Sequence, residues 1–172
     1  YQSNGALDTT FDTDGKVSVT IGGDDDDIRE LVVDSAGRIV VAGESFNGSK
    51  RNVLVGRFTS SGVLDTTFGG TGLITQSVTS GDDIGWGMSL QLDGKIVIGG
   101  VANYANGDFL LMRYLMNGTL DSSFGAGGIL TAPIGSADDR GIGLAIQNDG
   151  RIVLVGASFD GNDYDAALAR FQ

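Results

Sequence analysis

Three pairs of adjacent aspartates are the residues of this chain best suited to chemistry. They are Asp25-Asp26, Asp82-Asp83 and Asp138-Asp139, and they recur at intervals of 57 and 56 residues. Neighbouring carboxylates can ligate a hard cation such as calcium, and two aspartates that face each other across the centre of the fold can act as the acid and the base of a glycoside hydrolase. Acid–base catalysis needs carboxylates in unlike environments, whereas copies of one repeat supply like ones. The pattern therefore favours a binding or structural role over catalysis.

Aromatic and amide side chains gather in three further segments, residues 46–51, 103–107 and 159–164. Antiparallel strands would place these segments at the same end as the paired acids, so both sets would share one face of the fold. This loop face is a candidate surface for a sugar, a calcium ion or a protein partner. Its candidate residues are Asp25, Asp26, Asp82, Asp83, Asp138, Asp139, Phe46, Tyr104, Phe159 and Tyr164. The alternative is that the acids form turns and add solubilising charge.

A calcium loop is a candidate within this face. Asp160, Asn162 and Asp163 have oxygen-bearing side chains at alternate or adjacent positions, similar to the start of a calcium-binding loop. Tyr164 offers no carboxylate or amide, and the glycine and glutamate of such a loop do not follow. Calcium is therefore the one cofactor left as a candidate.

The composition narrows the chemistry further. The 172 residues include no histidine and no cysteine, which excludes Ser-His-Asp and Cys-His nucleophiles, thiolate or imidazole zinc sites, and disulfides. All but two of the 22 acidic residues are aspartate, and the formal net charge is -11. Such a surface repels phosphates, so we expect no nucleic-acid partner. No apolar run is long enough to cross a bilayer, so we expect no membrane insertion.

An internal repeat predicts the elements that position these residues. The motif L-D-T-T-F at residues 7–11 returns at 64–68 and, as L-D-S-S-F, at 120–124. Each repeat contains four short apolar or alternating segments bounded by turn residues, which is typical of β-strands. In the first full copy they are residues 29–33, 38–45, 52–58 and 73–78. The fold class predicted is all-β, a β-propeller of four-stranded antiparallel blades, with a β-sandwich of tandem repeats as the competing fold.

The strand inventory predicts one domain over residues 1–172 with three blades. Segment 1–22 comes first, and it contains a strand near residues 16–21 that corresponds to the fourth strand of a repeat. Two full repeats, 23–79 and 80–135, and the partial repeat 136–172 follow. The first strand is expected to complete the last blade. Propellers have 4–8 blades, so we expect a homodimer in which each chain's first strand pairs with the other chain, giving a six-bladed ring. The alternatives are a head-to-tail filament or a fragment of a longer propeller.

Two further sets of residues recur with the repeat. Arg57, Arg113 and Arg170 are expected to pair with turn aspartates as structural latches, and the candidate partners are Asp8, Asp65 and Asp121. These aspartates sit in the L-D-x-x-F motif, where an aspartate also caps a tight turn. Trp86, the only tryptophan, is expected in the core.

The repeat resembles the bacterial delta-60 repeat, a β-propeller repeat of secreted and surface proteins. The resemblance covers the whole chain and is carried by Asp82-Asp83, D-G-K-I-V at 93–97, A-L-A-R-F at 167–171 and G-V-L-D-T-T-F-G at 62–69. It implies a secreted or cell-surface location and offers no catalytic residues. The function expected is a non-catalytic structural or binding scaffold. The alternative is an extracellular carbohydrate-active hydrolase or a calcium-dependent lectin that uses the aspartate-rich face.

Overall fold

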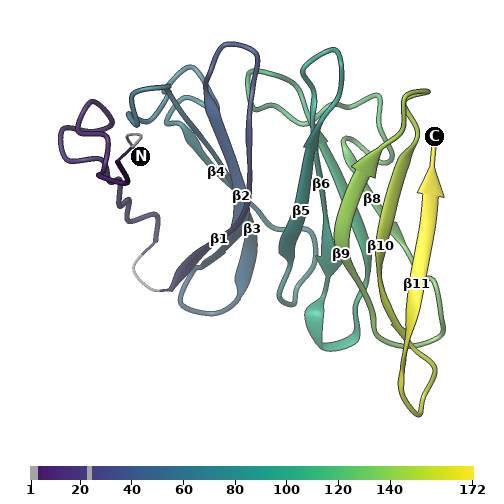
Figure 1. The fold of residues 1–172 in the computed structure, drawn as a ribbon. Coiled ribbons are helices and arrows are strands. Elements are labelled where there is room, and N and C mark those ends of the chain that lie inside the picture. The colour runs from purple at the N-terminus through teal and green to yellow at the C-terminus, as the bar shows by residue number, and fades with distance from the viewer. Residues whose placement is uncertain (1–3, 23–24) are drawn as a thin grey trace.

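A computed structural model of the chain describes residues 4–22 and 25–172. These residues form eleven β-strands and one short 3-10 helix. The strands make three antiparallel sheets that stand side by side along the chain (Figure 1). Within residues 4–22 and 25–172, no helix is long and apolar enough to cross a membrane.

Each sheet is a meander in which consecutive strands are hydrogen-bonded neighbours. The first sheet contains β1 (Asp26–Val33), β2 (Ile39–Phe46), β3 (Arg51–Phe58) and β4 (Leu73–Gln76). The second contains β5 (Ile84–Leu90), β6 (Ile96–Ala102), β7 (Asp108–Tyr114) and β8 (Ile129–Ala132), with the 3-10 helix η1 (Tyr104–Asn106) between β6 and β7. The third contains β9 (Asp139–Ile146), β10 (Ile152–Phe159) and β11 (Tyr164–Phe171). The all-β, four-strand repeat predicted from the sequence is confirmed for the first two sheets.

Two apolar layers join the three sheets face to face. The layer between the first and second sheets includes Val55 and Leu110, and the layer between the second and third includes Leu111 and Leu154, all 0% exposed. Burial of each such side chain contributes about 2 kcal/mol. The backbones approach closely because small residues face the neighbouring sheet: a Cβ on Gly99 would lie 2.5 Å from Leu154 Cδ1.

The first strand of every sheet contains a β-bulge at the same repeat position. The pairing register skips Arg29 in β1, Trp86 in β5 and Ile142 in β9. A bulge adds one unpaired residue and redirects its side chain, so strict alternation along these strands breaks there. Trp86 was predicted to lie in the core, but in the structure its position at the bulge leaves it half-buried.

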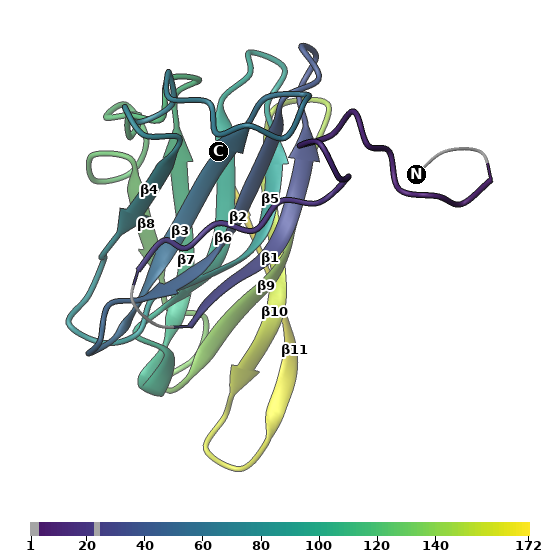
Figure 2. The same cartoon turned by 90° about the vertical axis from the view of Figure 1, so that its left-hand side faces the viewer.

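The expected strand near residues 16–21 does not form in the structure. These residues have no strand assignment and run extended across the first sheet (Figure 2). A strand needs a hydrogen-bonded neighbour, and the predicted neighbour, β11, lies at the opposite end of the molecule (Figure 1). The third sheet therefore has three strands, and the chain does not complete its own last blade.

Candidate functional site

The second acid of each pair is used by a turn, and in the second and third pairs it is fully buried. Asp83 is 0% exposed, and its Oδ2 accepts the N–H groups of Val78 and Thr79 at 2.8 and 2.9 Å. Asp26 and Asp139 accept the equivalent pairs of N–H groups in their own repeats. These three carboxylates end the segment that leads into each first strand, which is a structural role.

The first acid of the second and third pairs ties one sheet to the preceding one. Asp82 Oδ1 accepts the N–H of Arg51, at the start of β3, at 2.7 Å. Asp138 Oδ1 accepts the N–H of Gly107, just before β7, at 3.0 Å. Asp25 has the same position in the first sheet, where no described sheet precedes it. It is exposed, and its carboxylate accepts no hydrogen bond from a described residue.

Arg140 organises the aromatic part of the loop face, and the sequence analysis missed it. Its guanidinium carbon lies 4.4 Å from the ring centroid of Tyr104 and 5.0 Å from that of Tyr164. Its Nη2 lies 2.6 Å from Asp138 Oδ2, which also accepts a hydrogen bond from the Tyr164 hydroxyl. Burial alone would raise the pKa of Asp138, but the Tyr164, Gly107 and Arg140 hydrogen bonds outweigh it and hold the pKa below its ordinary value. The sequence did contain a signal for this residue: Arg140 is an arginine at a repeat position where the other two copies have Ile84 and Asp27.

The remaining aromatic residues extend this cluster or lie apart from it. Trp86 packs edge-on against Tyr104 with ring centroids 5.9 Å apart, and Phe159 lies 5.0 Å from Tyr164. Phe46 belongs to the first sheet, where Arg51 lies 5.9 Å from its ring. The structure thus gathers Tyr104, Phe159 and Tyr164 around Asp138 but leaves Phe46 separate. Arg140, Asp138 and the two tyrosines are hydrogen-bonded, ion-paired or stacked with one another, so we interpret the cluster as a contact between the second and third sheets.

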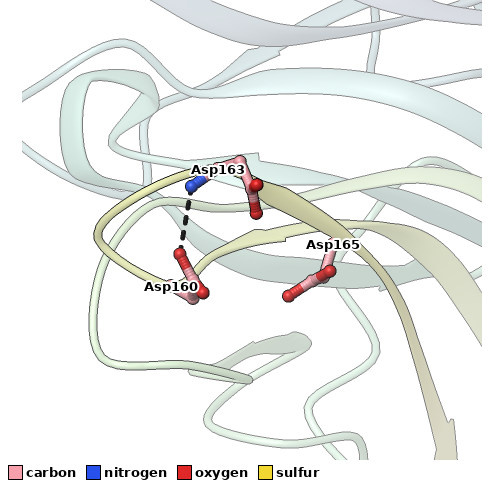
Figure 3. Close-up of side chains that lie close together, drawn as sticks. All are labelled: Asp160, Asp163 and Asp165. Atoms are coloured by element: carbon pink, nitrogen blue, oxygen red, sulfur yellow. Dashed lines mark hydrogen bonds between the residues drawn. The ribbon is translucent and has the colours of Figure 1, made fainter.

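The calcium candidate is an exposed hairpin between β10 and β11. The structure adds Asp165 to it: carboxylate oxygens of Asp160, Asp163 and Asp165 lie within 4.8 Å of one another (Figure 3). Asp160 already accepts the N–H groups of Asn162 and Asp163 at 2.7 and 3.0 Å, which lowers its pKa. The side-chain oxygens that are buried without a partner in the described residues all lie elsewhere. Asp160 therefore acts as a turn acceptor, while all three carboxylates of the hairpin are exposed.

Two of the three predicted latches are present. Arg57 Nε lies 2.8 Å from Asp65 Oδ2, and Arg113 Nε lies 2.9 Å from Asp121 Oδ2. Both aspartates have a lowered pKa because a neighbouring hydroxyl, that of Thr67 or Ser123, donates to them and the arginine lies beside them. The third predicted pair, Arg170 and Asp8, is not formed within the chain, because the two residues lie at opposite ends of the molecule (Figure 1).

An apolar groove of about 350 Å³ lies between the N-terminal segment and the first sheet. Phe11, Val17 and Ile21 line one side of it, and Ile28, Leu31, Val41 and Leu54 belong to the first-sheet side. Leu31 and Ile28 are 54% and 55% exposed. At the other end of the molecule, Val155 and Leu168 of the third sheet are 37% and 69% exposed. Apolar side chains are therefore exposed at both ends of the described chain.

Comparison with known protein families gives one match. Residues 37–68, 91–124 and 147–172 each match the model of a β-propeller domain of unknown function, DUF5122. The matched stretches together cover just over half of the chain and fall once in each repeat. The comparison with curated proteins found no match to this chain.

Proposed function

Because this chain belongs to the DUF5122 β-propeller family, we propose that it is a non-catalytic scaffold that completes its propeller by associating with a second copy of itself. The three sheets are then half of a six-bladed ring with two-fold symmetry. Six blades fall within the 4–8 that propellers have. Each copy would cover the other's two end surfaces, so a closed ring leaves no open sheet edge.

The observation that carries this proposal is the equivalence of the end surfaces to buried inner ones. Leu168 has the repeat position of Leu111, which is 0% exposed against the third sheet. Leu31 has the repeat position of Met88, which is 6% exposed against the first sheet. At an inner junction, one sheet presents the Leu168-type position and the next sheet covers it with the Leu31-type position. The two end surfaces of the chain have the same two sets of residues, but nothing in the described chain covers them. A second copy is the occupant that supplies the covering residues.

The hydrolase and lectin alternatives are not favoured. Both require carboxylates free to face a substrate or an ion. Asp82, Asp83, Asp138 and Asp139 instead accept backbone N–H groups of neighbouring turns. In a scaffold these acids have only a structural role, which is to fix turns and to link neighbouring sheets by accepting backbone hydrogen bonds.

The mass of the 172-residue chain in solution tests the proposal. Sedimentation equilibrium at micromolar concentrations should give twice the chain mass of 17.7 kDa. Leu168→Asp should shift the protein to monomer, because it places a charge in the new interface. Leu92→Asp is the matched control, since Leu92 is fully exposed on a loop. A wild-type monomer throughout the concentration range contradicts the proposal, and a series of larger species supports filament growth instead of ring closure.

A further inference from the structure

Each inner latch is a set of four contacts made by one arginine. Arg57 pairs with Asp65, donates to Thr67 Oγ1 at 2.9 Å and lies 4.8 Å from the ring of Phe68. Its backbone N–H donates to the carbonyl of Gly72 at 2.8 Å. The arginine stands at the end of the third strand, and the acceptors follow in the turn that leads to the fourth strand.

The second inner latch has the same contacts. Arg113 pairs with Asp121, donates to Ser123 Oγ at 3.2 Å and lies 4.6 Å from the ring of Phe124. Its N–H donates to the carbonyl of Gly128 at 2.9 Å. The unit is therefore one arginine followed by aspartate, hydroxyl, phenylalanine and glycine at offsets of 8, 10, 11 and 15 residues.

A third acceptor half is present near the N-terminus, and no arginine of the described residues pairs with it. Asp8, Thr10, Phe11 and Gly15 have the same residue types and spacing. Asp8 Oδ1 accepts the N–H and the hydroxyl of Thr10 at 3.0 and 2.7 Å, and the Gly15 N–H donates to the Phe11 carbonyl at 2.7 Å. Asp65 with Thr67, and Gly72 with Phe68, make the same bonds in the first inner latch. The acceptor half is thus folded without its cation.

The first sheet holds this half where an inner junction would hold it. The Asp12 N–H donates to the Ser61 carbonyl at 2.9 Å, as that of Gly69 donates to the Asn117 carbonyl at 2.9 Å. Gly62 has φ +87° and contacts the side chains of Phe11 and Val17. Its counterpart Gly118 contacts Phe68 and Ile74 in the same way.

The matching donor half is at the other end of the chain. Arg170 is exposed on β11, at the repeat position of Arg57 and Arg113. Among the described residues, neither Arg170 nor Asp8 belongs to an ion pair, and the fourth place beside β11 is not filled. Asp8 and Arg170 therefore present opposite charges at the two ends of the described chain.

We infer that Arg170 of one copy enters the acceptor half formed by Asp8, Thr10 and Phe11 of a second copy, an inference that rests on the proposed self-association. Residues 16–19 of the second copy then become the fourth strand of the third sheet. The pairing of β3 with β4 sets its register: Ala169 faces Lys16, Leu168 faces Val17, Ala167 faces Ser18 and Ala166 faces Val19. A general apolar contact would be unselective, whereas this latch requires an arginine at the position of Arg170 in the sheet that docks.

Charge exchange tests the latch separately from self-association. Arg170→Asp alone and Asp8→Arg alone each place like charges together in both latches of a dimer, and should weaken association by about tenfold or more. An equimolar mixture of the two variants restores opposite charges in both latches, so it should associate like wild type. Arg151→Asp and Asp163→Arg are matched controls, because they make the same charge changes away from the latch; Arg151 is half-buried and pairs with Asp149, and Asp163 is exposed. Circular dichroism confirms that each variant is folded.

The outcomes separate the two proposals. If wild type associates and the single variants associate equally well, the latch is wrong and self-association stands. If the single variants weaken association but their mixture does not restore it, the effect is one of net charge and the latch is again wrong. If wild type itself is a monomer, the proposed function fails.

A disulfide across the predicted contact is a second test. Phe58 and Leu64 form an isolated β-bridge, as do Tyr114 and Leu120, and the equivalent pair is Phe171 of one copy and Leu7 of the other. The chain has no cysteine, so Leu7→Cys combined with Phe171→Cys should cross-link copies under diamide, an oxidant of thiols. A covalent dimer supports the latch in a closed ring and a ladder supports it in a filament. An uncrosslinked chain in an associating sample overturns it.

Discussion

The inner junctions and the end surfaces use the same repeat positions but differ in what covers them. Leu111 is 0% exposed against the third sheet, whereas Leu168, its counterpart, is 69% exposed. Arg113 pairs with Asp121, whereas Arg170 has no ion-pair partner in the described part of the chain. Because the residue types are the same, the neighbouring sheet and not the side chain decides burial and pairing. The predictions below change matched residues in the two regions.

The largest effect is expected from truncating the buried leucine. Leu111→Ala should lower the free energy of unfolding by about 3 kcal/mol, because it removes buried surface and leaves a cavity. Leu168→Ala, measured at dilutions where the chain is monomeric, should lower it by less than about 0.5 kcal/mol. Urea unfolding followed by fluorescence measures both. Equal losses would mean that Leu168 is already covered within one chain.

The latch arginine should have the next largest effect. Arg113→Met should lower the free energy of unfolding by about 2 kcal/mol, because it removes a hydrogen bond between two charged groups and leaves only Lys95, 3.4 Å away, beside the Asp121 carboxylate. Arg170→Met should not change the stability of the monomer, since Arg170 forms no ion pair within the described part of its own chain. Thermal unfolding of both variants at low protein concentration checks this. A common melting temperature for Arg113→Met and wild type would contradict a stabilising latch.

A buried hydroxyl offers a gain in stability. Tyr114 is 1% exposed, its hydroxyl has no partner among the described residues, and burial raises its pKa well above the ordinary value. Phe58 and Phe171 occupy the equivalent positions without a hydroxyl. Tyr114→Phe should therefore raise the free energy of unfolding by about 1 kcal/mol. Phe171→Tyr at the end surface should leave it unchanged, and a loss in Tyr114→Phe would reveal an unseen partner.

Acid should weaken the inner latches selectively. The pKa of Asp65 lies below its ordinary 3.8 because the Thr67 hydroxyl donates to it and Arg57 lies beside it. A carboxyl with a lower pKa in the folded state contributes stability above its unfolded pKa, and this contribution is lost as the pH falls through the folded pKa. Unfolding free energy should therefore decline below about pH 4, and Asp65→Asn should flatten that decline. Asp8→Asn should flatten it less, because the Thr10 hydroxyl and N–H lower the pKa of Asp8 without an arginine of the described residues beside it.

The smallest effect is expected at the acidic hairpin. Calcium added to the chain should change the free energy of unfolding by less than about 0.5 kcal/mol, because the acids are exposed and Asp160 already serves the turn. Asp163→Asn should behave like wild type with and without calcium. A calcium-dependent rise in melting temperature that Asp163→Asn abolishes would establish an ion site there.

Local patterns predicted most of the fold and part of the site. Alternating apolar residues and glycine or aspartate turns placed the strands, and the recurrence of Arg57 with Asp65 and Arg113 with Asp121 predicted two latches. The bulge at Trp86 was missed because the residue types of β5 continue the alternation. The Arg140 cluster was missed because two of the partners of Arg140, Tyr104 of η1 and Tyr164 of β11, come from other elements, which only packing brings together.

The sequence by itself determined the repeat, the all-β class and the exclusion of histidine and cysteine chemistry, because period and composition need no partner to be read. Only the tertiary structure decided which acids are free. It engages Asp82 and Asp138 with the preceding sheet and leaves Asp25 exposed, although the three have the same repeat position. The physical reason is that hydrogen bonding and burial depend on the sheet that lies alongside, and each end of this molecule faces no other sheet in the described chain.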